Sequence, residues 1–210
     1  MKPTKIILTL FLFLISVVSM AQHELSDSDK AALQERVKQK VDEFVHYLGN
    51  IVNKDLSDAQ RQNSVKSAIE LFVGKGERWS IVNDYGEKEY RNPVRMQISS
   101  VNRNYSSWLS MKKYLQNQYN NIHKYGKVVI ESADVVRVDN INRVGDGQYE
   151  AMAYYCQKYI AFRDGRVVYG DITTKKIKVY ISALEVLGSV IWEAKLGDVY
   201  VTATKPLGDG

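Results

Sequence analysis

The second half of the chain shows the alternation of apolar and polar positions that is typical of β-strands. β-Branched residues, which favour a pleated surface, are frequent in it. Glycine-containing turns separate the apolar runs, and a short turn between neighbouring strands indicates antiparallel pairing. The pattern predicts four long strands, Lys127–Ile141, Tyr149–Phe162, Arg166–Ile181 and Val190–Ala203, joined at Gly145-Asp146-Gly147, Asp164-Gly165 and Leu187-Gly188.

The pattern also assigns faces to part of this region. Both faces of Tyr149–Phe162 are substantially apolar, so no inward face is assigned to it. Gly197 interrupts the last strand and predicts a β-bulge or a bend. Because long antiparallel strands twist and curl, we expect helices to fill the curve. In the third strand the alternation is clean, with Ile177, Val179 and Ile181 on one face and Lys176, Lys178 and Tyr180 on the other.

The first half of the chain has helical periodicity instead. Ser26-Asp27-Ser28-Asp29 predicts a helix start, because acidic residues stabilise the positive end of the helix dipole. A second helix is predicted to begin at Ser57-Asp58 and to end at Gly74-Lys75-Gly76. The long first helix has its apolar residues on one stripe: Leu33, Val37, Val41, Phe44, Val45, Leu48, Ile51 and Val52. The stripe of the second helix is Val65, Ala68, Ile69 and Phe72.

Between the helices and the long strands the pattern changes twice. Trp79–Asn83 and Lys88–Arg91 flank Asp84-Tyr85-Gly86 and predict a small hairpin. Val94–Val101 alternates, and we interpret it as an extension of the second arm. A third helix is predicted from about Ser107 to Asn120, with an apolar stripe of Trp108, Met111, Leu115 and Tyr119.

The N-terminus has the features of a cleaved signal peptide. Two lysines precede the apolar run Ile6–Val18, and small residues follow it at Ser19 and Ala21. The run is shorter than the roughly 20 residues that span a bilayer, so we expect cleavage after Ala21 rather than a membrane anchor. We therefore expect a periplasmic or secreted bacterial protein in which residues 22–210 form one domain.

The charge of the chain changes little without that segment. Residues 22–210 hold 27 basic and 24 acidic side chains, a net charge of +3. No basic cluster is interleaved with aromatic residues, so we expect no nucleic-acid partner. The densest basic patch, Lys175, Lys176 and Lys178, is interpreted as a solvated face of the sheet.

The element order is helix, helix, small hairpin, helix and four long antiparallel strands. This order, together with the tail Val190-Ile191-Trp192-Glu193-Ala194, resembles the nuclear-transport-factor-two-like fold, also called the ketosteroid-isomerase or SnoaL-like cone. A cystatin-like wrap is the alternative, but it uses a single long helix. The resemblance implies an α+β domain whose N-terminal helices pack in the concave face of a strongly curved antiparallel sheet, with a cavity between them. The family includes isomerases, cyclases, dehydratases and non-catalytic binding modules, and dimers through the outer sheet face are common in it.

No acid–base constellation emerges from the residue spacing. The candidates by strand position are Glu131, Asp134, Asp139, Glu150, Tyr155, Tyr169, Asp171 and Glu193. The three histidines, His23, His46 and His123, have no placed partner, and no metal-ligand cluster is recognised. The single cysteine, Cys156, excludes an intrachain disulfide and is interpreted as a buried, inert thiol. We assign no catalytic, cofactor-binding or metal-binding residue.

Two functions from different classes follow from these observations. The first is an exported, non-catalytic binding or assembly module that holds a small apolar ligand or a protein partner, with a homodimer through the outer sheet face. The second is a small-molecule lyase or isomerase. It requires an Asp or Glu with a raised pKa inside an open cavity.

Overall fold

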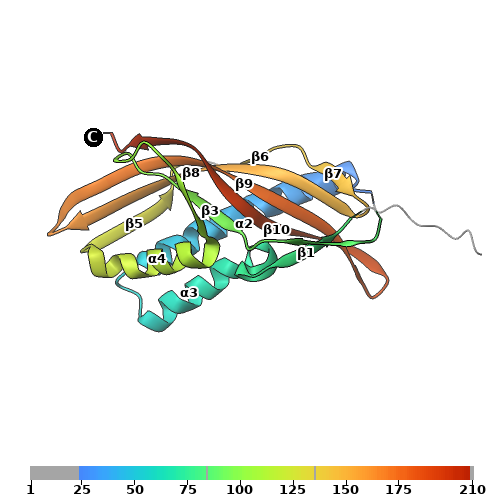
Figure 1. The fold of residues 1–210 in the computed structure, drawn as a ribbon, viewed down its shortest axis with the longest axis horizontal. Helices are drawn as coiled ribbons and strands as arrows, with labels where there is room; N and C mark the ends of the chain where they lie inside the picture. Colours follow the sequence, from blue (N-terminus) through green and yellow to red (C-terminus); the bar gives the residue numbers. More distant parts are fainter. Residues whose placement is uncertain (1–23, 84, 135, 209–210) are drawn as a thin grey trace, which may run out of the picture.

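The structure, a computed structural model, describes residues 24–83, 85–134 and 136–208 (Figure 1). The predicted signal peptide lies outside the described residues. Helices pack against one side of a long, twisted sheet, as Figure 1 shows. The α+β cone class predicted from the element order is confirmed by this arrangement. None of the described helices combines the length and the apolar character that crossing a membrane requires.

The two N-terminal helices begin where the sequence predicts. Helix α2 (Asp27–Val52) is capped by Ser26, whose side chain accepts from the backbone N–H of Asp29. Helix α3 (Asp58–Glu70) has the same reciprocal capping box between Ser57 and Gln60. The buried residues of α2 are the eight of the predicted stripe. The long helix is therefore held by its apolar face, as its periodicity requires.

A buried arginine fixes α3 against the other two helices. Arg61 is 3% exposed, and its Nε donates to the carbonyl of Ile51 at the end of α2 over 2.8 Å. The same guanidinium donates to the carbonyl of Tyr119, over 2.5 Å, in α4 (Met111–Lys124). The carbonyls of Ile51 and Tyr119 thus satisfy the guanidinium group, whose burial without hydrogen bonds would be costly. These contacts hold α4 in place, and α4 forms one wall of the cavity described below.

The main sheet contains eight strands. Its order is β4-β3-β10-β9-β8-β5, and the short strands β6 and β7 also pair with β8. The bounds are β3 (Arg95–Ile98), β4 (Ser107–Ser110), β5 (Lys127–Ser132), β6 (Arg137–Val138), β7 (Asn142–Gly145), β8 (Gln148–Arg163), β9 (Arg166–Val186) and β10 (Ser189–Pro206). The predicted turn at Asp164-Gly165 joins β8 to β9, and both of its residues have positive φ, as the tightest hairpins require.

Several local predictions are wrong. Val94–Val101 does not extend the hairpin, since β3 lies in the main sheet and pairs with β10 in parallel. That pair is an exception to the antiparallel arrangement we expected. Ser107–Ser110 is strand β4 rather than the first turn of a helix, because it pairs with β3. Trp108 accordingly lies on a strand, where its ring contacts that of Tyr200.

The first predicted long strand, Lys127–Ile141, is broken into β5 and β6, and a third short strand, β7, follows it. All three pair with β8, so the segment follows its partner for its whole length. Ser132 faces Gln157 and Arg137 faces Tyr154, so the chain advances five positions against three on β8. Extra residues on one strand disrupt the ladder and bend the edge. The β-branched residues of this segment do not indicate the break.

The core lies between α2 and the inward face of the sheet. Helix α2 contacts β5, β8 and β10. On β9 the predicted alternation is confirmed, because Ile177, Val179 and Ile181 are at most 1% exposed. The structure also settles the inward face of β8, which is Tyr149, Ala151, Ala153, Tyr155 and Gln157.

The predicted irregularity at Gly197 is confirmed. Leu196 pairs with Val179 and Val199 pairs with Ile177, so three residues of β10 span two of β9. A Cβ at Gly197 would lie 2.5 Å from the Cε2 of Tyr180, which explains the glycine.

The small hairpin, β1 (Trp79–Val82) and β2 (Lys88–Arg91), is also confirmed. It folds over the outer face of the main sheet, where the ring of Trp79 contacts that of Tyr180.

Candidate functional site

Two hollows lie on opposite faces of the main sheet. One is a cavity of about 650 Å³ on the concave face, between α4, the residues around β3, and the β8–β9 pair. The other is a groove of about 580 Å³ on the outer face, under the hairpin. Buried ionisable groups distinguish the first from the second.

The concave cavity receives its polar side chains from one face of β9. Asp171, Thr173 and Lys175 alternate with outward residues and continue the face that holds Ile177. Their cross-strand partners on β8 are Tyr159, Gln157 and Tyr155 in turn. The inward face of the β8–β9 pair thus changes from apolar to polar along its length.

Lys175 is the buried cation of the cavity. It is 4% exposed, and its Nζ donates to the Oε1 of Gln157 over 2.9 Å. The Sδ of Met96 lies 3.8 Å from the same nitrogen, and the centroid of the Tyr114 ring lies 5.6 Å away. Burial lowers the pKa of Lys175 to about 8, and the attraction of Asp171 offsets only part of that effect.

Asp171 is the buried carboxylate. It is 5% exposed, and the hydroxyl of Tyr169 donates to its Oδ2. Thr173 Oγ1 lies 3.5 Å from Oδ1, and Ser100 Oγ lies 2.9 Å from the Tyr169 oxygen. Burial raises the pKa of Asp171, while the hydrogen bond from Tyr169 and the attraction of Lys175 act in the opposite direction. A carboxylate with a raised pKa in a cavity is the feature that the lyase or isomerase hypothesis requires.

Several neutral tyrosines complete the lining. Burial raises the pKa of Tyr114 and of Tyr159, so both remain hydrogen-bond donors at neutral pH. The rings of Tyr159 and Tyr169 meet edge to face, with centroids 5.9 Å apart. Next to the cavity, the hydroxyl of Tyr155 is buried and has no hydrogen-bond partner among the described residues. The lining combines aromatic surface with fixed donors.

Two exposed cations stand at the mouth of the cavity. Arg103 and Lys124 belong to its lining, and both are exposed. With Lys175 they make three cations against one carboxylate, Asp171, among the ionisable Lys, Arg, Asp and Glu residues that line it. The cavity therefore has a positive balance that would attract an anion.

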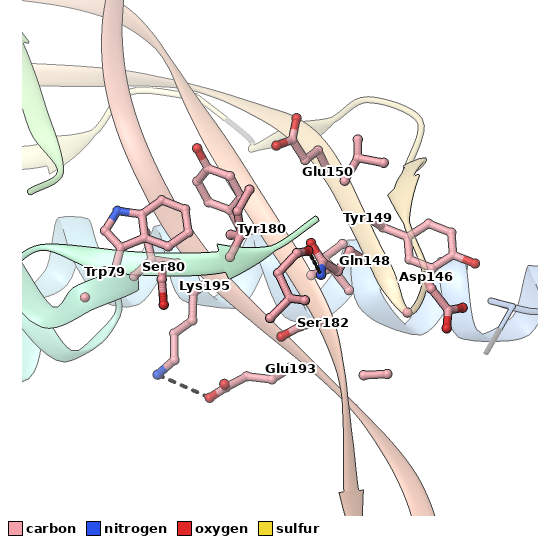
Figure 2. A pocket seen from close by; sticks show the side chains of 18 of the residues that line it. Trp79, Ser80, Asp146, Gln148, Tyr149, Glu150, Tyr180, Ser182, Glu193 and Lys195 are labelled. Carbon is pink, nitrogen blue, oxygen red and sulfur yellow. Dashed lines mark hydrogen bonds and ion pairs between the residues drawn. The ribbon is translucent and has the colours of Figure 1, made fainter. Parts of the chain in front are cut away.

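The outer groove has a different electrostatic character. Figure 2 shows Trp79 and Tyr180 at one end and the Lys195–Glu193 ion pair, 3.3 Å long, along its floor. Gln148 Nε2 donates to the carbonyl of Val82 over 2.6 Å, which ties the hairpin to β8. The Lys195 side chain is 26% exposed and that of Glu193 is 42% exposed. Charges that are solvated and already paired with each other attract a charged ligand only weakly.

The predicted candidates divide among these places. Tyr169 and Asp171 line the concave cavity, and Tyr155 is buried beside it. Glu150 and Glu193 line the outer groove. Glu131 and Asp139 form exposed ion pairs, with Lys158 and Arg137, and Asp134 is exposed as well.

The histidines and the cysteine do not join the cavity. His46 lies on α2 and shares a hydrogen bond with Asn50, while His123 is exposed near the end of α4. His23 lies outside the described residues. Cys156 is half-buried on the outer face, 3.6 Å from the hydroxyl of Thr174, so it is less buried than we expected. Among the described residues, no three His, Cys, Asp or Glu side chains form a group that could hold a metal ion.

The interpretation of Lys175 as part of a solvated basic face is wrong. Lys176 and Lys178 do point outward, but Lys175 lies on the inward face. The sequence contained the signal, since Lys175 stands two residues before Ile177 and shares its parity. Local clustering of lysines masked that alternation. Gln157 and Thr173 were missed for a related reason, because uncharged polar residues on a strand give no distinctive pattern.

Comparison with known proteins adds little to these observations. No family model matches the chain, and no curated protein matches it. Among solved structures, the chain is similar to a crystal structure from Novosphingobium aromaticivorans that carries the name "Putative Scytalone Dehydratase". The TM-score is 0.42 at 11% sequence identity, over 87% of this chain and 93% of that one. The fold assignment therefore rests on the element order and sheet topology of this chain itself.

Proposed function

We propose that the protein binds a small organic anion in the concave cavity. The observation that carries the proposal is Lys175, a buried cation that donates to the neutral amide of Gln157 and lies near the sulfur of Met96. Among the described residues, no ion pair joins it to a carboxylate. Asp171 attracts the Lys175 charge without forming an ion pair with it. A buried charge that lacks a contacting counter-ion is costly, and an anionic ligand would remove that cost.

The lining narrows the chemistry of the ligand. Tyr114, Tyr159 and Tyr169 offer aromatic edges, Tyr114 and Tyr159 also offer hydroxyl groups, and Arg103 and Lys124 stand at the mouth. This composition favours a planar or aromatic carboxylate. The apolar ligand that we expected from the sequence suits the lining less well, since buried donors would be left unpaired.

Ligand-observed NMR with a matched pair of probes tests the proposal. Benzoate and benzamide have the same shape and differ in charge. We expect the wild-type protein to bind benzoate at least tenfold more tightly than benzamide. Lys175→Met should lose that preference, and Lys176→Met, one residue away on the outer face, should retain it. Equal binding of the two probes by the wild type, no binding of either, or the same loss in Lys176→Met would contradict the proposal.

Proton linkage provides an independent check. Near pH 8, where the pKa of Lys175 lies, an anion that pairs with the ammonium group should draw a proton onto the protein. Calorimetric titration of benzoate in buffers of different ionisation enthalpy should show this uptake. It should disappear in Lys175→Met. Anion binding with no proton uptake at pH 8 would argue against Lys175 as the partner.

A second function, that of a lyase or isomerase, is favoured by one observation. Asp171 has a raised pKa, lines the cavity and accepts from the Tyr169 hydroxyl, so it is placed to take a proton from a bound carbon acid. Exchange of α-protons of small ketones in D₂O, followed by NMR, tests this role. Asp171→Asn should abolish the exchange, whereas Asp139→Asn, at an exposed carboxylate, should not. Wild-type exchange no faster than in buffer would rule out this activity.

Export and self-association remain predictions from the sequence. We propose that the mature chain works outside the cytoplasm, on the strength of the signal-peptide pattern in residues 1–21. For a homodimer through the outer sheet face, the hairpin limits the available surface, since it covers part of that face near Tyr180. Mass determination of the secreted protein tests both, because it gives the cleavage site and the oligomeric state.

A further inference from the structure

We propose that the Lys175 amine condenses with the carbonyl group of a small oxo acid, forming an imine inside the concave cavity. The inference rests on the proposed function, because the carboxylate of the oxo acid is the anion that the cavity binds. It adds a reactive group to the ligand class and a covalent role to Lys175.

The position of the amine is the first support. Lys175 lines the cavity from the middle of β9, whereas Lys124, the other lysine of the lining, is exposed at the mouth. The carbonyl oxygen of the Gln157 amide holds one N–H of Lys175 at 2.9 Å. An amine fixed on one side by an acceptor presents its remaining positions to the cavity, which is the orientation that attack on a bound carbonyl needs.

The surroundings of the amine are the second support. The groups that face it are Gln157 and Tyr155 on β8, Met96 on β3, Tyr114 on α4 and Asp171 on its own strand. Asp171 is the one carboxyl group among them, and the other four are uncharged at neutral pH. The rest is a poorly solvated shell that disfavours the ammonium form. With a pKa of about 8, roughly one molecule in ten holds the free amine at pH 7, against about one in several thousand for an ordinary lysine.

The cavity also holds the groups that proton transfer needs. In the first step the amine nitrogen bonds to the carbonyl carbon, and the nitrogen proton passes to the carbonyl oxygen, giving a carbinolamine. In the second step the hydroxyl leaves as water after gaining a proton, and the carbon–nitrogen double bond forms. Asp171 and Tyr169 line the same cavity and are the groups placed to move these protons. No oxidant or reductant takes part.

The shape of the cavity suits an oxo acid in one orientation. Arg103 and Lys124 at the mouth attract the carboxylate as the oxo acid enters. Because the carbonyl carbon is adjacent to the carboxylate, pairing of the carboxylate with Lys175 brings that carbon next to Nζ. The aromatic edges of Tyr159 and Tyr169 can accommodate a planar substituent. Benzoylformate and pyruvate are therefore suitable probes, one with a ring and one without.

Reductive trapping tests the inference. The full mature chain is incubated with benzoylformate or pyruvate and cyanoborohydride, which reduces an imine to a stable secondary amine. Intact-mass measurement and peptide mapping then locate the adduct. We expect a single adduct at Lys175, at least tenfold above any other lysine. Lys176→Arg should react as the wild type does, and Lys175→Arg should give no adduct while retaining a cooperative thermal transition.

Adducts spread evenly over exposed lysines, or undiminished in Lys175→Arg, would overturn the inference. Its failure can be separated from failure of the anion site by measuring benzoate binding on the same samples. Benzoate binding without an adduct would support the anion site and contradict imine formation. If Lys175→Arg does not fold, competition by benzoate against trapping in the wild type replaces it, and trapping that benzoate leaves unchanged would count against the inference.

Discussion

The two ends of the inward face of β8 and β9 differ in what they do for the protein. At one end Ala151, Ala153, Ile177 and Val179 belong to the same hydrophobic core as the apolar stripe of α2 and are at most 4% exposed. At the other end the same face holds Gln157, Asp171, Thr173 and Lys175, which are buried to a similar degree. One register of pairing joins both ends without a break. Equal burial therefore has opposite consequences, since it stabilises the apolar end and weakens the charged form of Lys175 and Asp171 at the polar end.

The apolar end of this face stabilises the fold, whereas the polar end lines a cavity that could bind a ligand. The apolar end is filled by a helix whose side chains match it in polarity. The polar end faces α4 and the residues around β3, and a cavity remains there. A cavity among polar groups is the usual setting for a ligand, whereas close packing among apolar groups is the usual setting for a core.

The largest expected effect is the loss of stability when a buried side chain at the apolar end is truncated, compared with a substitution at the polar end. Ile177→Ala removes a fully buried side chain from the apolar end and should lower the free energy of unfolding by about 2–5 kcal/mol. Thr173→Val, four residues away on the same face, keeps its volume and should change it by about 1 kcal/mol or less. Urea denaturation of both variants measures the contrast. Equal losses would mean that the Thr173 hydroxyl group contributes as much to stability as the buried side chain of Ile177.

The next effect is the pH dependence that Lys175 gives to stability. Its pKa is lowered on folding from 10.5 to about 8, a difference worth roughly 3 kcal/mol at about 1.4 kcal/mol per pH unit. Below pH 8 both states are protonated, and the full cost of burying the charge is present. Between pH 8 and 10.5 only the unfolded state holds the proton, so the wild type gains stability as the pH rises.

Lys175→Met removes that titration. We expect the variant to exceed the wild type in stability by the largest margin below pH 8, and the margin to shrink as the pH rises to about 10.5. The difference in free energy of unfolding between the two proteins, measured at several pH values, isolates this group. Lys176→Met should show no such trend. A margin that does not change with pH would place the Lys175 amine in water.

A smaller effect is expected at the bulge of β10, which lies beside Ile177 and Val179 of β9. Gly197→Ala places a Cβ 2.5 Å from the Tyr180 ring and 3.2 Å from the backbone oxygen of Lys178. The ring can move, but the backbone cannot move freely, so we expect a loss of about 1–3 kcal/mol in the free energy of unfolding. Gly208→Ala, where nothing lies within 4 Å, is the control. Thermal unfolding of the pair is sufficient, and matching transitions would show that the bulge tolerates a side chain.

The smallest effect concerns the hydrogen bond at the polar end. Tyr169→Phe removes the donor to Asp171 and should cost about 1 kcal/mol. It should also raise the pKa of Asp171 further, because the hydrogen bond lowers it now. A ¹³C NMR titration of the aspartate carboxyl groups measures the pKa directly. Tyr200→Phe on the outer face is the control, and an Asp171 titration that is the same in all three proteins would contradict the assignment.

Much of the scaffold could be predicted from local sequence. The eight residues of the α2 stripe, the capping serines and the turn at Asp164-Gly165 follow from rules that act over a few residues. Gly197 could be read as a bulge for the same reason. Where the predictions failed, the deciding partner was distant. Ser107–Ser110 became a strand because β3 lies beside it, and β5 ends early because of its register on β8.

The candidate site was less predictable than the fold. Parity with Ile177 could have placed Lys175 inside, but its neighbours Lys176 and Lys178 favoured a solvated patch. Asp171 and Tyr169 were among the candidates, without any indication that they meet. Gln157 required knowledge of the inward face of β8, which the mixed apolar composition of that strand did not supply.

By itself, the sequence determined the order of the helices, the hairpin and the long strands, the starts of α2 and α3 and the apolar stripe of α2, because propensity, capping and periodicity act locally along the chain. Only the tertiary structure decided which buried positions meet apolar partners and which meet a cavity. Alternation places Ile177 and Lys175 on one face without saying what covers each. The first lies in the hydrophobic core that includes the α2 stripe, and the second lines a cavity beside α4, so burial stabilises one and lowers the pKa of the other.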